Sequence, residues 1–162
     1  MIIAQTALNP LIAGNTAWRH DWLWGCPLIV ATVTIHVLGL GFISQRAIRI
    51  FGNTTAKYRH RRVSFVWIMG LTTLSATVLH GIESYIWALT YYLLGALPDM
   101  KNATLYSLGA ITTYGHPNLH LEERWQLMGA IEALNGWLLF GLSSAFLFWL
   151  IQEVSPNNQA DG

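Results

Sequence analysis

The chain has 162 residues, of which 53% are hydrophobic and only 10% charged, with a formal net charge of +1. Charged residues make up about a quarter of an ordinary soluble domain, so the composition favours one compact membrane domain. The small net charge gives no bulk field for nucleic acid, and Cys26, the single cysteine, excludes an intrachain disulfide and a thiolate metal cluster.

The amino-terminal segment, residues 1–17, is interrupted by Asn9-Pro10 and Gly14-Asn15 and has no positive charge before Arg19. A cleaved signal peptide needs a basic region at its start, so none is expected here. The interruptions predict an interfacial or loosely ordered segment.

Three later segments are long and apolar enough to cross a bilayer, at about residues 23–44, 63–97 and 125–151. A spanning helix needs roughly 20 apolar residues. The second segment exceeds that length, so we expect it to tilt, to bend near Gly81 or to protrude.

The orientation follows from the basic residues. Six of the nine lie between the first two spans: Arg46, Arg49, Lys57, Arg59, Arg61 and Arg62. The positive-inside rule places this loop in the cytoplasm. We expect a multi-pass protein of the cell (inner) membrane, with its amino terminus outside and its carboxyl terminus, including the polar tail 155–162, in the cytoplasm.

A short helix is expected after the second span. Pro98-Asp99 ends that span, and Asp99 or Asn102 is a candidate N-cap for a helix reaching about Ile111. This helix is too short to cross, so it either dips into the membrane and returns or lies at the interface outside. In the first case its partially negative carboxyl end points toward the membrane centre and favours a cation.

The turn that follows reads Thr112-Thr113-Tyr114-Gly115-His116-Pro117-Asn118. Irregular backbone at membrane depth is tolerated only where it is buried in protein or lines a water-filled cavity. A short helix, a tight turn and a full span in this order therefore indicate an ion pathway.

Three motifs flank this turn. They are Trp87-Ala88-Leu89 with Leu94-Gly95-Ala96-Leu97, the run 103–111, and Glu132-Ala133-Leu134-Asn135-Gly136 with Leu138-Leu139-Phe140-Gly141. In this order they resemble the outer helix, pore helix and inner helix of the tetrameric potassium-channel pore family, in particular its small bacterial two-helix members. The resemblance covers about residues 80–148.

The first span falls outside the resemblance and is an addition to the minimal pore, so we expect an all-α integral membrane protein with three transmembrane helices. The resemblance implies a re-entrant pore helix and a filter loop, assembled as a homotetramer. It implies an amino-terminal part (1–62), a pore module (63–154) and a tail (155–162). The ion, K⁺ or Na⁺, would be coordinated by a filter formed by Thr112, Thr113, Tyr114, Gly115 and His116.

The filter departs from the family's threonine-valine-glycine-tyrosine-glycine-aspartate run, which aligns on residues 113–118. Pro117 replaces the second glycine, and Asn118 replaces the aspartate. Proline fixes φ near about −65° and removes a donor, so the outer half of a carbonyl ladder cannot take its usual shape. We expect a cation channel with reduced potassium selectivity, or a pore closed at its outer end.

His116 replaces the filter tyrosine. Four imidazoles around one axis would titrate near physiological pH and repel cations when protonated, which predicts block by external acid. The alternative is that His116 packs behind the filter and hydrogen-bonds a neighbour.

Other polar residues and glycines lie within the spans. Glu83 shares a helix face with His80, and either Glu83 or Glu132 could support the pore helix or tune cation occupancy; a satisfied buried network is the alternative. Gly136 and Gly141 are candidate hinges in the third span, or sites of close helix packing.

Two other function classes stay open. A membrane haem or metal protein would use His36 and His80 as axial ligands, or would bind a metal outside through His116, His120, Glu122 and Glu123. A non-conducting or regulatory subunit would keep only the channel-like fold. No nucleophile–base pair, phosphate loop or acid pair indicates an enzyme, and we expect no cofactor beyond the permeant cation, no nucleic acid and no small-molecule substrate; the expected partners are the lipid bilayer and three further copies.

Overall fold

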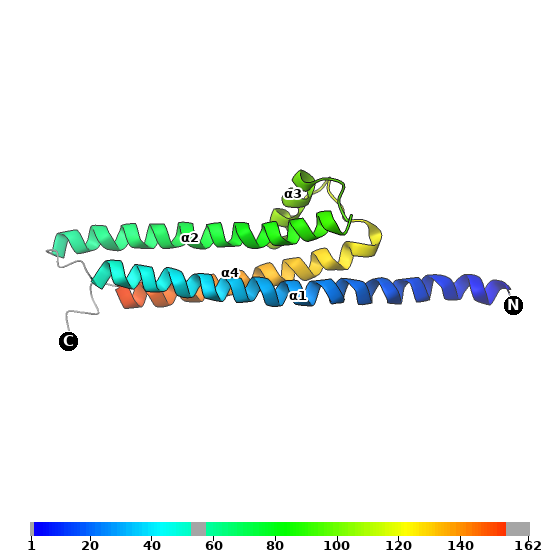
Figure 1. Ribbon diagram of the computed structural model, residues 1–162, viewed down its shortest axis with the longest axis horizontal. Helices are drawn as coiled ribbons and strands as arrows, with labels where there is room; N and C mark the ends of the chain where they lie inside the picture. Colours follow the sequence, from blue (N-terminus) through cyan, green and yellow to red (C-terminus); the bar gives the residue numbers. More distant parts are fainter. Residues whose placement is uncertain (1, 53–57, 155–162) are drawn as a thin grey trace. The chain divides into compact units, whose positions relative to one another are not determined.

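The computed structural model describes the backbone of residues 2–52 and 58–154 and the side chains of residues 19–50 and 63–154. Within these ranges every regular element is helical (Figure 1). The elements are α1 (Ile2–Gly52), α2 (Tyr58–Leu93), α3 (Met100–Ile111), the 3-10 turn η1 (Glu123–Trp125) and α4 (Gln126–Val154). The predicted all-α class is confirmed for this part of the chain.

The three long helices contain stretches long and apolar enough to cross a membrane, at Arg19–Ile50, Val63–Leu93 and Glu123–Val154. These stretches correspond to the three spans predicted from the sequence. By length and composition, these three helices suit a multi-pass membrane protein. Of the residues used to orient it, Lys57 lies outside the described ranges, as do the tail 155–162 and the side chains of Arg59, Arg61 and Arg62.

The amino-terminal segment is helical and not loosely ordered, whereas its interfacial position stays a prediction. The backbone of α1 is helical from Ile2 and continues through Asn9-Pro10 into the first span. Proline removes one helical N–H, but its fixed φ of about −65° is itself helical, so a long helix can continue past it.

The second span ends four residues earlier than predicted, at Leu93. Gly95 follows with φ +66, and the N–H groups of Ala96 and Gly95 donate to the carbonyls of Tyr91 and Tyr92 at 2.9 and 3.1 Å. This is the Schellman pattern that closes many helices, and it needs a residue, usually glycine, in the left-handed region. Gly95 therefore ends α2.

The chain divides into two compact units. Unit 1 contains Met1–Thr32 and Ser84–Trp137, and unit 2 contains Val33–Glu83 and Leu138–Gly162. This is a division by contacts; the sequence-based boundaries at residues 62 and 154 stay a prediction.

Unit 1 has an apolar core to which α2, α3 and α4 contribute. Its fully buried large side chains include Trp87 and Tyr91 of α2 and Met128 and Ile131 of α4, and Ala103 of α3 is also fully buried. Unit 2 has two smaller buried clusters, one of Leu40, Ala76 and Leu79 and one of Ala47, Ile68, Leu150 and Val154.

Gly136 allows α3 to meet α4 closely. A Cβ at this buried position would overlap the carbonyl oxygen of Ile111, the last residue of α3. Gly141 has no atom within 4 Å of the place where its Cβ would lie. Gly136 is therefore a site of close packing, whereas a hinge at either glycine stays a prediction.

We predict that Gly136→Ala lowers the free energy of unfolding by about 1–3 kcal/mol, because the new methyl group pushes α3 off α4. Gly141→Ala is the matched control, and its effect should stay within about 1 kcal/mol, the difference in helix propensity between the two residues. Unfolding of both variants in mixed detergent micelles measures this. Equal effects at the two positions would contradict the close contact.

Candidate functional site

The amino-terminal end of α3 is fixed by Asp99. Its Oδ1 accepts a hydrogen bond from the backbone N–H of Asn102 at 2.9 Å, and its Oδ2 accepts one from the Asn102 side chain at 2.7 Å. Of the two predicted candidates, Asp99 is thus the N-cap. The helix then runs for 12 residues to Ile111, as the sequence predicted.

The carboxyl-terminal end of α3 leads into a tight turn. The N–H of Thr113 donates to the carbonyl of Ala110 at 2.9 Å, and the N–H of Gly115 donates to that of Gly109 at 3.0 Å. Two residues of the turn have positive φ, Gly115 at 70° and Thr113 at 57°. Glycine adopts this region freely, but a β-branched residue there is an outlier that costs about 1–3 kcal/mol.

The predicted filter residues are exposed in the single chain. Thr112, Thr113, Tyr114 and Gly115 are all exposed, and Tyr114 is 85% accessible. Their coordination of an ion from several chains stays a prediction.

The residues after the turn vary in exposure. His116 is half-buried, and its Nδ1 atom is buried without a hydrogen-bond partner in the described chain. Pro117 and Asn118 are exposed. His116 thus packs partly against the protein, as one of its two readings required, but Nδ1 makes no hydrogen bond to a neighbour.

Glu132 is the centre of a buried polar network in unit 1. Its Oε2 accepts a hydrogen bond from the Tyr91 hydroxyl at 2.7 Å, and its Oε1 lies in hydrogen-bonding contact with the Ser107 hydroxyl. Ser107 also donates to the Ser84 carbonyl at 2.7 Å and lies 3.0 Å from the Ser84 hydroxyl. All four side chains are fully buried, so the network joins α2, α3 and α4 at one point.

The sequence singled out Glu132 but missed its two hydroxyl partners, Tyr91 and Ser107, and the contact of Ser107 with Ser84. The usable signal was weak: serine and tyrosine within apolar helices commonly hydrogen-bond across a helix interface. Asn135 also makes a hydrogen bond across a helix interface: its side-chain amide donates to the Thr32 hydroxyl of α1 at 2.8 Å.

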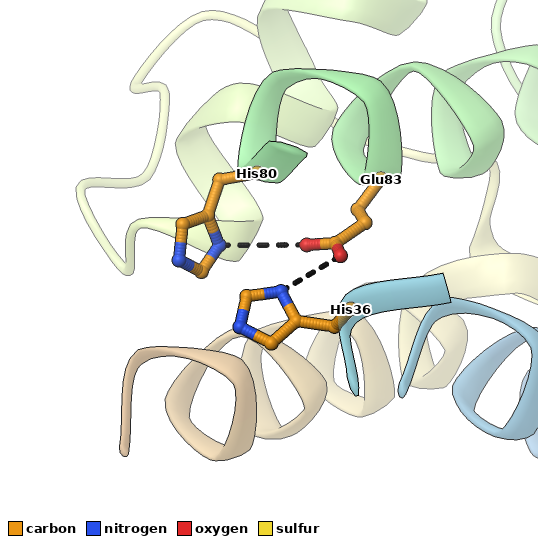
Figure 2. Close-up of side chains that lie close together, drawn as sticks. All are labelled: His36, His80 and Glu83. Carbon is orange, nitrogen blue, oxygen red and sulfur yellow. Dashed lines mark hydrogen bonds and ion pairs between the residues drawn. The ribbon is translucent and has the colours of Figure 1, made fainter. Parts of the chain in front are cut away.

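A second polar cluster lies in unit 2. Figure 2 shows the Nδ1 atoms of His36 and His80 turned toward the Glu83 carboxylate. His36 Nδ1 lies 2.8 Å from Glu83 Oε1, and His80 Nδ1 lies 3.5 Å from Glu83 Oε2. Both histidines also place Nε2 at 3.0 Å from the hydroxyl of Ser143 on α4.

The two carboxylates that were predicted to support the filter thus have different partners. Glu132 contacts α3, whereas Glu83 contacts two histidines. The pairing of His36 with Glu83 was missed because 47 residues separate them and a helical pattern relates only near neighbours.

The structure also distinguishes between the two predicted sets of metal ligands. Within the described side chains, His36, His80 and Glu83 form the one group whose ligand atoms all lie within 4.8 Å of one another. The other predicted set, His116, His120, Glu122 and Glu123, is not brought together in this way, and Glu122 pairs with Arg124 at 3.0 Å.

Comparisons of the chain with protein-family models, with curated proteins and with solved structures give no match.

The Glu132 network predicts a large stability effect. Glu132→Ala should lower the free energy of unfolding by about 2–4 kcal/mol, because it leaves a cavity and removes the carboxyl group that two buried hydroxyls contact. Glu132→Gln keeps the volume and one acceptor and should have a smaller effect. Thermal unfolding in detergent tests both, with Glu153→Ala, at an exposed position of α4, as the control. A loss no larger at Glu132 than at Glu153 would contradict the role of the network.

Proposed function

We propose that the chain is the subunit of a tetrameric cation channel that resembles potassium channels and has reduced potassium selectivity. The observation that carries the proposal is an exposed, irregular turn at the end of a short helix, at the level of the eleventh residue of the apolar helix α4.

The depth of the turn follows from how α3 pairs with α4. Ser107 of α3 meets Glu132 of α4, and Ile111 meets Gly136, so the two helices run in the same direction. Gly136 lies ten residues after Gln126, the first residue of α4. At 1.5 Å per residue this is about 15 Å, half of the roughly 30 Å thickness of a hydrocarbon core.

The chain then returns toward the side from which α3 started. Gly115 lies beside Gly109 of α3, and the N–H of Glu122 reaches the carbonyl of Ala96, just after α2, at 3.5 Å. A helix going in and an irregular segment coming back on the same side favour the re-entrant reading over an interfacial helix.

The exposure of the turn supports assembly. Irregular backbone at membrane depth cannot face lipid, because its N–H and C=O groups would lack partners. Thr113, Tyr114 and Gly115 are nonetheless exposed in the single chain. Further copies of the chain around a closed symmetry axis would cover them and enclose water, and each copy would supply one turn.

The chemistry of the turn suits a cation. The partially negative carboxyl end of α3 reaches it, and its carbonyl and threonine oxygens can replace the hydration shell of K⁺ or Na⁺. The fixed φ of Pro117 opposes an outer ring of carbonyls, and this favours weak discrimination between the two ions. In this proposal the protein lies in the cell membrane with its amino terminus outside.

The test is single-channel recording of the purified chain in planar bilayers, with K⁺ on one side and Na⁺ on the other. We expect clear openings and a reversal potential near zero. A reversal near the potassium limit would refute the reduced selectivity, and silence from protein of tetrameric mass would favour a non-conducting subunit.

A matched pair of glycine variants locates the pathway. Gly115 and Gly95 both have positive φ, 70° and 66°, and both have open space where a Cβ would lie. Alanine therefore strains the backbone similarly at the two positions, at about 1 kcal/mol. We expect Gly115→Ala to change conductance or selectivity and Gly95→Ala to leave both unchanged. The same result for the two variants would argue against ion passage at the turn.

External acid should reduce the current, since protonated His116 side chains would repel cations at the axis. The measurement is the single-channel current at a series of external pH values, with His120→Gln as a control at an exposed position. We expect His116→Gln to abolish the acid effect, and persistence of the effect in that variant would rule out His116 as its origin.

A further inference from the structure

We propose that His36, His80 and Glu83 bind a divalent transition-metal ion of the zinc class, and that Ser143 orients both imidazoles. The site lies within unit 2 and would join α1 to α2. It goes beyond the proposed channel function and does not depend on it.

The donor atoms have the separation that such an ion needs. Both Nδ1 atoms face the Glu83 carboxylate, at 2.8 Å for His36 and 3.5 Å for His80 (Figure 2). Ligands held at 2.0–2.2 Å from a tetrahedral zinc ion lie about 3.3 Å from one another. The two observed separations lie on either side of this value and end on different oxygens of the carboxylate, so the carboxylate would have to turn to bring one oxygen to this distance from both imidazoles.

Ser143 supplies what metal-binding histidines usually have on their far side. A histidine that binds a metal through one nitrogen normally donates its other N–H to an acceptor, which fixes the tautomer. The Ser143 hydroxyl oxygen lies 3.0 Å from the Nε2 atoms of both His36 and His80, and its two lone pairs can accept both N–H groups. Both Nδ1 lone pairs are then free to face the carboxylate.

Without a cation, the contacts among these four side chains lack one hydrogen-bond donor. Two neutral imidazoles and one serine hydroxyl supply three protons for four contacts around the ring of Glu83, His36, Ser143 and His80. Correspondingly, Glu83 Oε2 is buried and has no hydrogen-bond partner in the described chain. A metal ion would satisfy this oxygen; a fourth proton is the competing occupant.

Burial and access also fit a bound ion. Glu83 and His36 are fully buried in apolar helices, where ionisable side chains are costly and commonly mark a function. The His80 side chain is 26% exposed, which gives an entry route and leaves a fourth coordination position open. The two imidazole centroids lie only 4.9 Å apart and share Ser143, so the cluster suits a small ion better than a macrocycle between opposed histidines.

The experiment is equilibrium dialysis of the untagged full-length chain in detergent against Zn²⁺, followed by elemental analysis. We expect one zinc ion per chain. His36→Gln, His80→Gln and Glu83→Gln should each weaken binding by at least about 100-fold, since each removes a ligand of only three. Ser143→Ala removes the support of the ligands and should weaken binding by about 10–100-fold. His120→Gln, an exposed histidine, is the control and should bind as the unaltered chain does.

Two further measurements keep the result decisive. Co²⁺ in place of Zn²⁺ should give the visible absorption of a tetrahedral nitrogen–oxygen site, and this absorption should be lost in His80→Gln, whose side chain is partly exposed. If a single variant at His36 or Glu83 unfolds, the double variant His36→Gln/Glu83→Gln is used in its place. It removes both partners together and so leaves no unpaired buried charge. Absence of stoichiometric zinc, or zinc binding that survives loss of these ligands, would overturn the proposal and leave a proton in the ring.

Discussion

The arrangement of unit 1 depends on the hydrogen bonds that the buried carboxyl group of Glu132 makes. An apolar environment offers no water to a carboxyl oxygen, so every partner must come from the chain itself. Tyr91 and Ser107 supply these partners, and Ser107 in turn bonds to Ser84. Because they come from α2 and α3, the network holds the short helix against both long helices, at a fixed height and with its carboxyl end beside Gly136.

Unit 2 follows the same principle with a different chemistry. Its buried carboxylate, Glu83, faces imidazoles rather than hydroxyls. Ions of the zinc class prefer the lone pair of an imidazole nitrogen to the oxygen of a neutral hydroxyl. Two glutamates that look equivalent in the sequence thus belong to two kinds of site. One fixes the position of a helix, and the other faces two imidazoles.

The sequence predicted the features that depend on local chemistry. The Asp99 cap, the end of α3 at Ile111 and the three apolar helices all follow from neighbouring residues, and all appear in the structure. The His36–Glu83 pair could not be predicted, because it depends on which faces of two long helices meet. The end of α2 was misplaced because hydropathy continues to Leu97, while the backbone turns at Gly95. The filter and the tetramer remain predictions, because they are properties of several chains.

The approach of Gly115 to Gly109 has a consequence for tolerance to change. A methyl group on Gly109 would lie 3.2 Å from the Gly115 carbonyl oxygen, which is tighter than ordinary contact, so the turn would have to move outward by a few tenths of an ångström. In one chain this shift would be minor. In a ring of four identical turns every copy would move together, so the opening would change its radius on all sides at once. The absence of a side chain at Gly109 would then determine the radius of the opening in such an assembly.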